Sequence, residues 1–355
     1  MIVAGIDIGS RGAKAVTMKD GKILSYTIRD TGPESVKTSY MVANAVLEGT
    51  GLSLQDINYV VATGYGRILV PFAHENVSEI SAHARGINFY YPSVRTILDM
   101  GGQDCKAISC DEHGRVTNFV MNDKCAGGTG RFLEMIAEVL GFKVQEIGDA
   151  SLQSTSAIPF NTICAVFAKS EAISYLRQGI SRSDILAGLH DAIAVRCLNL
   201  LKRVGISKDF TITGGIAKNK GMVAKVKEKV ELEPMLAPDP QIIGALGAAL
   251  FAAERYQGKG TREDFKIHYG YTDATGNYFI VIDNAKCNAC GKCVSACPAK
   301  IFEVVSEDHN EPKAVVADKA RKRLSILCPG LSKCPKGREG TCKAVCEAEA
   351  ISLTW

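Results

Sequence analysis

The sequence lacks a long hydrophobic run and lacks a strong excess of either charge. No apolar stretch approaches the roughly 20 residues that a membrane-spanning helix needs, and the short apolar start is interrupted by Asp7. We therefore expect a cytoplasmic protein with no membrane partner. The 42 Lys and Arg residues against 38 Asp and Glu residues leave a net charge of +4, which is small for 355 residues. This balance gives no case for nucleic-acid binding.

What the sequence does contain is ample apolar residues and many cysteines. With 46% hydrophobic residues in 355, the chain is long enough for two or three domains, each with its own core. Eight of the 13 cysteines follow residue 286, in spacings typical of metal ligands. Because a cytoplasmic compartment is reducing, metal binding explains them better than disulfides do.

One local pattern occurs twice in the first 120 residues. In each copy an Asp closes a β-rich run, a Gly follows two positions later and a Lys seven positions later: Asp7, Gly9 and Lys14, then Asp99, Gly101 and Lys106. The repeat predicts two related lobes with facing hairpins. Backbone amides at Gly9-Ser10 and Gly101-Gly102 are suited to nucleotide phosphates, and the two Asp residues to Mg²⁺ held mainly through waters.

Two further cysteines each stand just before a predicted helix. Cys125 precedes a glycine-rich turn, Gly127-Gly128-Thr129-Gly130, and Cys164 precedes a helix from residue 165 to about 178. Such a turn can bind an anion through backbone N–H groups, and the positive end of the helix stabilises a thiolate. The alternative is that both are small buried hydrophobic residues. A second strand-to-helix turn, Gly214-Gly215, is suited to a nucleoside.

The last 70 residues have the cysteine spacing of a bacterial ferredoxin. The run from Cys287 to Cys297 ends in Cys-Pro. In ferredoxins, the first three thiolates of such a run bind one [4Fe–4S] cluster and the fourth binds another. The first cluster would then be held by Cys287, Cys290, Cys293 and Cys346, and the second by Cys297, Cys328, Cys334 and Cys342. Longer gaps leave zinc or a three-iron cluster open for the second set. The basic run 319–323 indicates a solvated face or a docking site for an acidic redox partner.

Residues 1–256 resemble the actin, Hsp70 and sugar-kinase ATPase superfold in their two hairpins, Gly214-Gly215 and a closing helix of small residues. Asp99 to Asp104, Asn122 to Gly130 and Cys164 are similar to the activator ATPases of 2-hydroxyacyl-CoA dehydratases and to the ATP-binding subunits of benzoyl-CoA reductases. The resemblance implies an α/β fold with two ribonuclease-H-like lobes, followed by a small α+β ferredoxin-like domain. We expect lobe I at about 1–95, lobe II at about 96–256, a linker at 257–273 and the ferredoxin-like domain at 274–355.

The same resemblance implies the site residues. ATP or ADP would contact Asp7, Gly9, Ser10, Lys14, Gly101, Gly102, Gln103, Gly128, Thr129, Gly214, Gly215 and Asn219. Catalysis would use Gln103 to position the attacking water, Asp104 as second choice, and Asp7 and Asp99. Cys125 and Cys164 would bind one [4Fe–4S] cluster shared by two protomers. Cys105 and Cys110 are expected in the core.

The resemblance therefore implies an ATPase that drives low-potential electron transfer. The donor would be a ferredoxin, a flavodoxin or another reduced carrier, and the acceptor an iron–sulfur dehydratase or reductase acting on an acyl-CoA or aryl-CoA. The chain would form a homodimer, or a heterodimer with a related ATPase subunit. A small-molecule kinase with an accessory ferredoxin domain is the alternative, and a sensor or assembly ATPase is a third reading.

Overall fold

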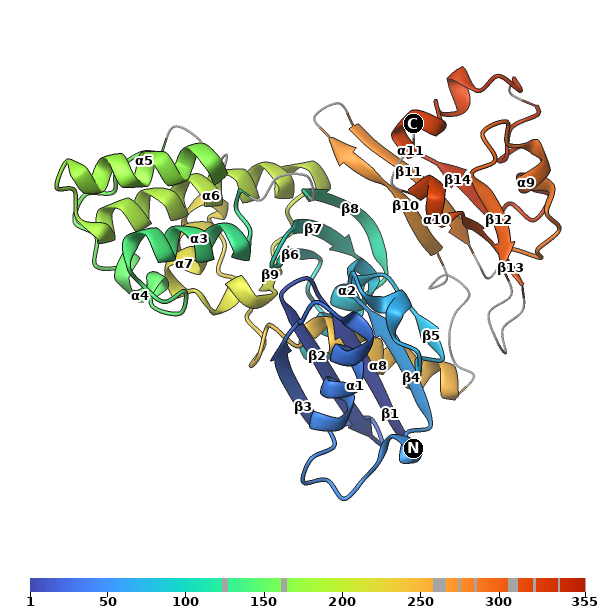
Figure 1. Cartoon of the computed structure of the whole chain (residues 1–355), viewed down its shortest axis with the longest axis horizontal. Helices are drawn as coiled ribbons and strands as arrows, with labels where there is room; N and C mark the ends of the chain where they lie inside the picture. The colour runs from blue at the N-terminus through green and yellow to red at the C-terminus, as the bar shows by residue number, and fades with distance from the viewer. Residues whose placement is uncertain are drawn as a thin grey trace. The chain divides into compact units, whose positions relative to one another are not determined.

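We describe the protein from a computed structural model. The described residues are 1–122, 127–160, 165–257, 266–273, 276–283, 286–305, 312–321, 324–337 and 339–354. They divide into two compact units, Met1–Lys259 and Gly260–Trp355 (Figure 1). We call the first the ATPase unit, after the family that its sequence resembles, and the second the tail.

The first lobe of the ATPase unit is a five-stranded sheet in the order β3-β2-β1-β4-β5. Its strands are β1 (Ile2–Ile8), β2 (Gly12–Lys19), β3 (Lys22–Asp30), β4 (Tyr59–Thr63) and β5 (Glu75–Asn76). The first three form an antiparallel meander, and β4 runs parallel to β1. Helix α1 (Ser35–Ala45) packs on β1 and β2. The short helices η1 (Leu54–Asp56) and η2 (Arg67–Leu69) lie in the connections.

The second lobe repeats this plan in a four-stranded sheet of order β8-β7-β6-β9. Its strands are β6 (Thr96–Met100), β7 (Cys105–Cys110), β8 (Val116–Asn122) and β9 (Phe210–Thr213). Again the first strand pairs antiparallel with its hairpin partner and parallel with a later strand. Asp7 stands beside Thr63 in the first lobe, and Asp99 stands beside Thr213 in the second. The repeat read from the sequence is therefore a repeat of structure.

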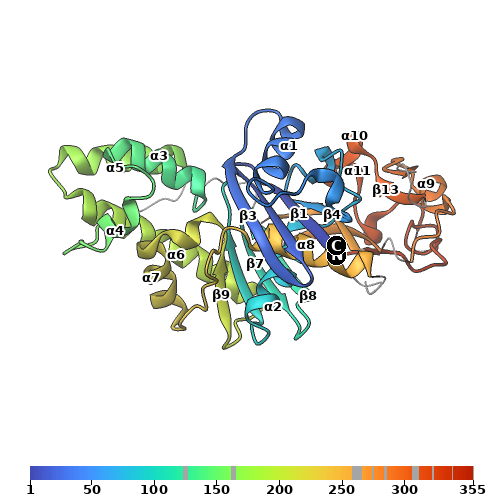
Figure 2. The same cartoon turned by 90° about the horizontal axis from the view of Figure 1, so that it is seen from below.

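Two helices join the sheets. Helix α8 (Ile243–Tyr256) packs on β1, β2 and β4, and α2 (Glu79–Tyr90) packs on β7 and β8. The two helices also pack on each other, and Figure 2 shows α8 between the first sheet and β7 and β8. A Cβ on Gly247 would stand 1.8 Å from the Ala82 oxygen, and one on Gly5 2.0 Å from the Ala245 oxygen. The small residues of α8 thus permit the close packing that joins the lobes.

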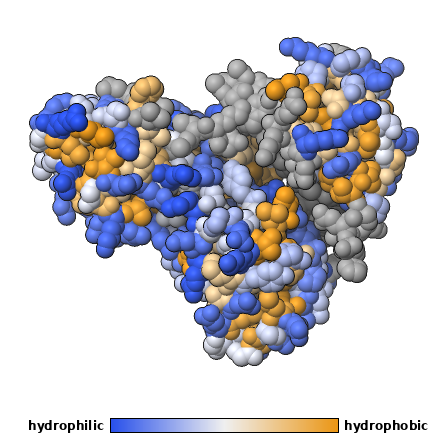
Figure 3. All heavy atoms as spheres, in the orientation of Figure 1, coloured by the Kyte–Doolittle hydropathy of each residue, from blue (hydrophilic) through white to orange (hydrophobic). Residues whose placement is uncertain are grey.

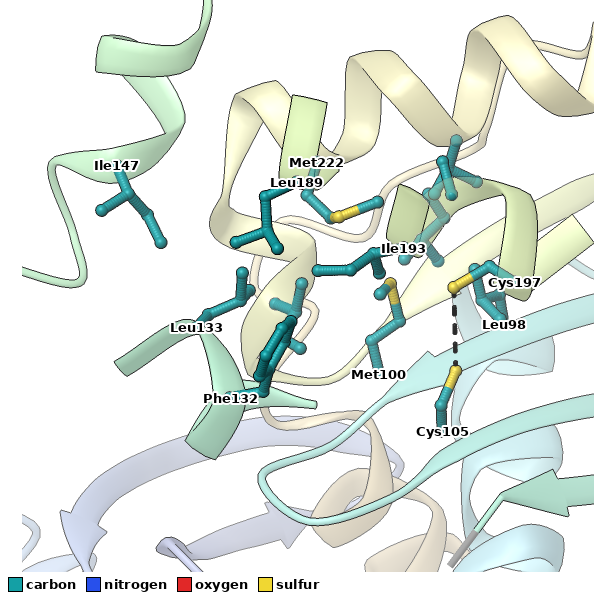
Figure 4. Packing of buried hydrophobic residues seen from close by; sticks show 14 of the residues in the cluster. Leu98, Met100, Cys105, Phe132, Leu133, Ile147, Leu189, Ile193, Cys197 and Met222 are labelled. Atoms are coloured by element: carbon teal, nitrogen blue, oxygen red, sulfur yellow. Dashed lines mark hydrogen bonds between the residues drawn. The ribbon is translucent and has the colours of Figure 1, made fainter. Parts of the chain in front are cut away.

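The helical part of the second lobe extends from its sheet. It contains α3 (Gly130–Leu140), α4 (Ile147–Ser151), α5 (Ala165–Arg177), α6 (Arg182–Val204), η3 (Gly215–Lys218) and α7 (Lys220–Val230). Figure 4 shows Phe132 and Leu133 of α3 meeting Leu189 and Ile193 of α6 in one core. In the same core the Sγ atoms of Cys105 and Cys197 lie 4.0 Å apart, both buried. Cys105 and Cys110 are core residues, as the sequence predicts.

The tail is a small α+β unit with its own core. Strands β10 (Lys266–Asp273), β11 (Gly276–Asp283) and β14 (Ile351–Leu353) form an antiparallel sheet. Strands β12 (Phe302–Val305) and β13 (Lys313–Val316) form a hairpin. The helices are α9 (Lys292–Ala296), α10 (Asp318–Arg321), α11 (Leu324–Leu327) and η5 (Leu331–Lys333). None of the helices in the described parts of either unit is long and apolar enough to cross a membrane.

Candidate functional site

A cleft of about 390 Å³ lies between the two lobes of the ATPase unit. Both hairpin turns and the Gly214-Gly215 turn face it. Of the residues that the sequence predicts for the nucleotide and for catalysis, it is lined by Asp7, Gly9, Ser10, Lys14, Asp99, Gly101, Gly102, Asp104, Gly214, Gly215 and Asn219. The two lobes therefore bring these predicted residues together at one site.

Asp7 and Lys14 form the first charged pair of the cleft. The Lys14 Nζ lies 2.9 Å from Asp7 Oδ2, and both side chains are largely buried. Gly64, at the end of the neighbouring parallel strand, has a φ of +85°. A Cβ there would stand 2.4 Å from Asp7 Oδ1. Only glycine leaves room for this carboxylate to face the cleft.

Asp99 is at the centre of the second charged cluster. Lys106 Nζ lies 2.6 Å from Asp104 Oδ2 and 3.5 Å from Asp99 Oδ2. Thr213 Oγ1 donates to Asp99 Oδ1 at 3.2 Å, and His83 Nδ1 lies 2.9 Å from the same Thr213 oxygen. All five side chains are buried. Gly214 caps this cluster with a φ of +85°, as Gly64 does in the first lobe.

Charge compensation keeps the buried groups of this cluster ionised. Burial alone acts to lower the pKa of Lys106, but Asp104, Asp99 and Glu79 outweigh it and raise that pKa. Burial acts to raise the pKa of Glu79, but Lys106 and Arg67 outweigh it and lower that pKa. Arg67 Nη1 lies 3.1 Å from Glu79 Oε2. The cleft floor is thus a network of paired charges, in which the pKa values of Asp99 and Glu79 are lowered and both carboxylates are negative at neutral pH.

Some cleft residues were missed in the sequence. Gly64 and Tyr65 were read as part of a turn without a function, and Glu79 as part of a helical connector, yet all three line the cleft. One signal could have found Gly64: the pair Thr63-Gly64 matches Thr213-Gly214 at the end of a parallel strand. The distance in sequence from the preceding Asp differs between the lobes, which hides the match.

The opposite end of the cleft is organised by Asn219. Its Oδ1 accepts from the Met222 N–H at 2.9 Å and so caps α7. Its Nδ2 lies 3.3 Å from His190 Nε2, while His190 Nδ1 lies 3.0 Å from Ser151 Oγ. Ser151 donates its own proton to the Gly148 oxygen at 2.7 Å. The network therefore assigns the His190 proton to Nδ1 and leaves Nε2 to accept from Asn219.

Helix α3 begins directly on the second hairpin. The Gly130 N–H donates to the Gly101 oxygen at 3.0 Å, and the Arg131 N–H donates to the Gly102 oxygen at 2.9 Å. The first turn of α3 is thus fixed to the phosphate-type turn at Gly101-Gly102. Cys125, a few residues before this helix, and Cys164, directly before α5, lie outside the described residues.

Three predicted nucleotide contacts are not among the residues that line the cleft. Gln103, the first choice for positioning water, is exposed, whereas Asp104 beside it is buried and faces the cleft. The hairpin turn directs alternate side chains to opposite sides, so the two cannot both face inward. Thr129 is buried as the N-cap of α3, and Gly128 packs near Ile193 with a φ of +88°.

In the tail, four cysteines line one cavity: Cys287, Cys290, Cys293 and Cys346. Burial and the neighbouring Cys287 and Cys346 raise the pKa of Cys293 to about 11. The Ala314 N–H donates to Cys287 Sγ at 3.3 Å, and the Ala350 N–H donates to Cys346 Sγ at 3.3 Å. Four converging thiols with N–H donors fit a [4Fe–4S] cluster, whose sulfur ligands are commonly hydrogen-bonded.

The remaining four cysteines of the tail also interact with one another. Burial, followed by Cys328, Cys297 and Cys334, raises the pKa of Cys342 to about 12. Cys328 likewise has its pKa raised by burial, and Cys297 and Cys334 act in the same direction. The first four thiols therefore share a cavity, and the second four influence one another's pKa values; the ligand grouping itself stays a prediction. Each group has the four sulfurs that a cubic cluster requires.

The profile of the BadF/BadG/BcrA/BcrD ATPase family matches residues 4–252. The chain belongs to this ATPase family. A 4Fe-4S binding domain matches residues 279–302. The recognition made from the sequence, the two-lobed ATPase fold and the iron–sulfur tail are thereby confirmed. ATP and an iron–sulfur cluster follow as cofactors of the family and the domain.

Individual relatives and solved structures agree with this assignment. The activator of lactoyl-CoA dehydratase from Anaerotignum propionicum is 46% identical over 260 residues, covering 73% of this chain and 100% of the relative. One of the subunits of benzoyl-CoA reductase from Thauera aromatica is 35% identical over 267 residues, covering 72% and 94%. The solved structure of (R)-2-hydroxyglutaryl-CoA dehydratase component A from Acidaminococcus fermentans has a TM-score of 0.70 at 40% identity, covering 72% and 99%.

Proposed function

We propose that this chain uses ATP hydrolysis to deliver single electrons at low potential to a partner enzyme acting on an acyl-CoA or aryl-CoA thioester. The observation that carries the proposal is the attachment of α3 to Gly101 and Gly102. A turn built for phosphate thereby holds the helix that follows Cys125. The names of the relatives, a dehydratase activator and a component of a reductase, support the class of partner.

Different cleft residues would contact different parts of the nucleotide. The N–H groups of Gly9 and Gly101 close the two turns by donating to the Gly12 and Asp104 oxygens. Those of Ser10 and Gly102 would bind phosphate oxygens, and Lys14 adds positive charge. Asp7 and Asp99 hold Mg²⁺ mainly through waters. Gly214, Gly215 and Asn219 line the nucleoside end. Asp104 orients the attacking water, a role that its inward position supports over Gln103.

The turn at Gly101-Gly102 would couple the nucleotide state to the position of α3. When the phosphate turn at Gly101-Gly102 shifts between nucleotide states, its two hydrogen bonds carry the start of α3 with it. Cys125 precedes Gly130, the first residue of that helix, by five positions in the sequence. Closing or opening the lobes therefore changes the relation between the two cysteine-led helices, α3 and α5.

The dimer would form around those two helices. Cys125 and Cys164 from each of two protomers supply four thiolates for one shared [4Fe–4S] cluster, which together with the two tail groups would supply one-electron transfer. Phe167, in the first turn of α5, is 64% exposed, which suits an apolar contact with a second protomer. Figure 3 shows hydrophobic residues on the visible face of this helical part of the unit.

Iron analysis tests the proposal. Two tail clusters give about eight irons per chain, and a cluster shared by two protomers adds about two more. We expect a Cys125→Ala, Cys164→Ala variant, purified anaerobically, to lose about two irons per chain and to dimerise more weakly with the tail still loaded. The matched control is Cys105→Ala, Cys197→Ala, which removes two buried thiols of the core and should leave the iron content unchanged.

The same samples test the coupling. ATP hydrolysis should continue in the variant that has lost the shared cluster, while ATP-dependent reduction of an acceptor protein stops. Equal iron in the variant and the native chain would contradict the shared cluster. ADP formation that requires a small-molecule substrate and no redox partner would favour a kinase instead.

A further inference from the structure

The two cysteine groups of the tail stand in different electrostatic surroundings. Lys333 precedes Cys334, Lys336 follows it by two residues, and Lys343 follows Cys342. All three lysines are exposed, and within the described part of the tail no carboxylate forms an ion pair with them. From 319 to 343 the sequence has eight Lys and Arg residues and a single acid, Glu339. In the described residues, the exposed lysines Lys333, Lys336 and Lys343 therefore give the second group basic neighbours.

The first group has a balanced surface instead. Lys292, next to Cys293, forms an ion pair with Glu347, next to Cys346. Lys286 and Glu349 add one further charge of each sign nearby in the sequence. Lys313 also lies at the first group, where its Nζ donates to the Cys287 oxygen at 2.9 Å. The first group thus has lysines and carboxylates together, whereas Lys333, Lys336 and Lys343 form no ion pair within the described part of the tail.

The two groups also differ in burial. Cys287 and Cys293 of the first group are buried, and its exposed member, Cys290, has the neutralised pair of Lys292 and Glu347 beside it. The fourth member of the first group, Cys346, is partly exposed, as are all four members of the second group, Cys297, Cys328, Cys334 and Cys342. The second group thus differs in having no fully buried member.

We propose that Lys333, Lys336 and Lys343 form the docking face for an acidic one-electron carrier protein, so that electrons reach the tail through the group of Cys297, Cys328, Cys334 and Cys342. This inference rests on the proposed function and adds to it the site of the donor. A cluster held by these four thiolates would take up the one electron that the reduced carrier gives up. No bond is made or broken.

Charge complementarity indicates which partner binds this face. Residues 260–355 contain 14 Lys and Arg against 12 Asp and Glu, and the whole chain contains 42 against 38, so neither unit is acidic overall. The ATPase unit therefore has no net negative charge with which to attract these lysines. A separate carrier with an acidic surface is steered to this face, at a rate that falls as salt rises.

Binding of an oxidised flavodoxin of net negative charge tests the face independently of turnover. The variant is Lys333→Gln, Lys336→Gln, Lys343→Gln, and the matched control is Lys19→Gln, Lys22→Gln, Lys208→Gln, which removes three exposed lysines from the ATPase unit. By calorimetry at low salt, we expect the tail variant to raise Kd about tenfold and to flatten its salt dependence. The control and a triple Lys→Arg variant should bind like the native chain.

Iron content, measured on the same samples, distinguishes a failure of the docking face from a failure of the proposed function. Fully loaded tails that bind the flavodoxin equally well in the native chain and the tail variant overturn the docking face alone. Equal weakening in the tail variant and the control also overturns it, since the effect would then follow net charge. A native tail without iron overturns the docking face and the proposed function together.

Discussion

The Arg11 guanidinium and the Glu134 carboxylate meet across the cleft in two contacts, Nη2 to Oε2 at 2.7 Å and Nε to Oε1 at 3.2 Å. Arg11 belongs to the first hairpin and Glu134 to α3, so the pair joins the first lobe to the helix that follows Cys125. Both residues line the cleft. The ion pair therefore closes one side of the nucleotide site.

We expect Arg11→Gln or Glu134→Gln to weaken binding of a non-hydrolysable ATP analogue about fivefold. Each side chain is at least one-third exposed, so the free energy of unfolding should change by less than about 1 kcal/mol. The double variant should be no weaker than either single variant, because one interaction is lost in all three. Fully additive losses in a double-mutant cycle would show that the two residues act separately.

Gly214 should tolerate no side chain. A Cβ there would stand 2.4 Å from the Met100 oxygen and 2.8 Å from Asp99 Oδ1, in addition to the strain of its φ of +85°. Gly205 is a matched control, since its φ is +84° and no atom lies within 4 Å of its added Cβ. Backbone strain costs about 1 to 3 kcal/mol at either position. Gly214→Ala should in addition weaken ATP binding at least tenfold, whereas Gly205→Ala should leave the affinity unchanged.

Lys106→Met should be among the most destabilising substitutions in the cleft. It leaves the buried carboxylates of Asp104 and Asp99 without their shared cation, which costs about 3 to 5 kcal/mol. The control is Lys218→Met, whose pair with Asp239 is half-exposed and should cost less than about 1 kcal/mol. Urea denaturation at pH 7 measures both. Similar losses in the two variants would mean that the buried network adds little to stability.

His190 should make stability depend on pH. Burial, assisted by Lys225, lowers the pKa of His190 to about 4. Below pH 6.5 the unfolded chain binds a proton that the folded chain excludes, so stability is complete above pH 6.5 and declines as the pH falls toward 4. Between pH 7 and pH 5 the loss due to His190 is about 2 kcal/mol.

A His190→Gln variant isolates that contribution. Its free energy of unfolding should change less between pH 7 and pH 5 than that of the native chain, by the same about 2 kcal/mol. It should also bind ATP more weakly at pH 7, because Nε2 of His190 holds the Asn219 amide. An identical pH dependence in the native chain and the variant would assign the acid sensitivity to other groups.

The elements of the fold were largely predictable because their signals are local. Helix α5 spans Ala165–Arg177, against the predicted 165 to about 178. The strand-to-helix turn predicted at Gly214-Gly215 follows strand β9, which ends at Thr213. The helix α1 was not foreseen, since Ser35 to Ala45 mixes polar and apolar residues without a clear apolar stripe. Its single buried face is created by the sheet on which it packs.

Site residues that belong to a sequence motif were predictable. Site residues that only the folded chain brings together were not. The hairpin residues Asp7 and Asp99 repeat in the sequence and were found. Glu79 lines the cleft and pairs with Arg67, which is 12 residues away in the sequence, and no sequence pattern links the two. Which of Gln103 and Asp104 faces inward depends on the twist of a turn, and the sequence does not contain that information in readable form.

The cysteines of the tail interleave along the chain. Cys297 of the second group follows the first three members of the first group, and Cys346 of the first group follows the last member of the second. The second group lies wholly between Cys293 and Cys346, so one deletion can remove it alone, whereas no single deletion removes the whole first group without the second. A truncation between Cys342 and Cys346 would keep every ligand of the second group and take one ligand from the first.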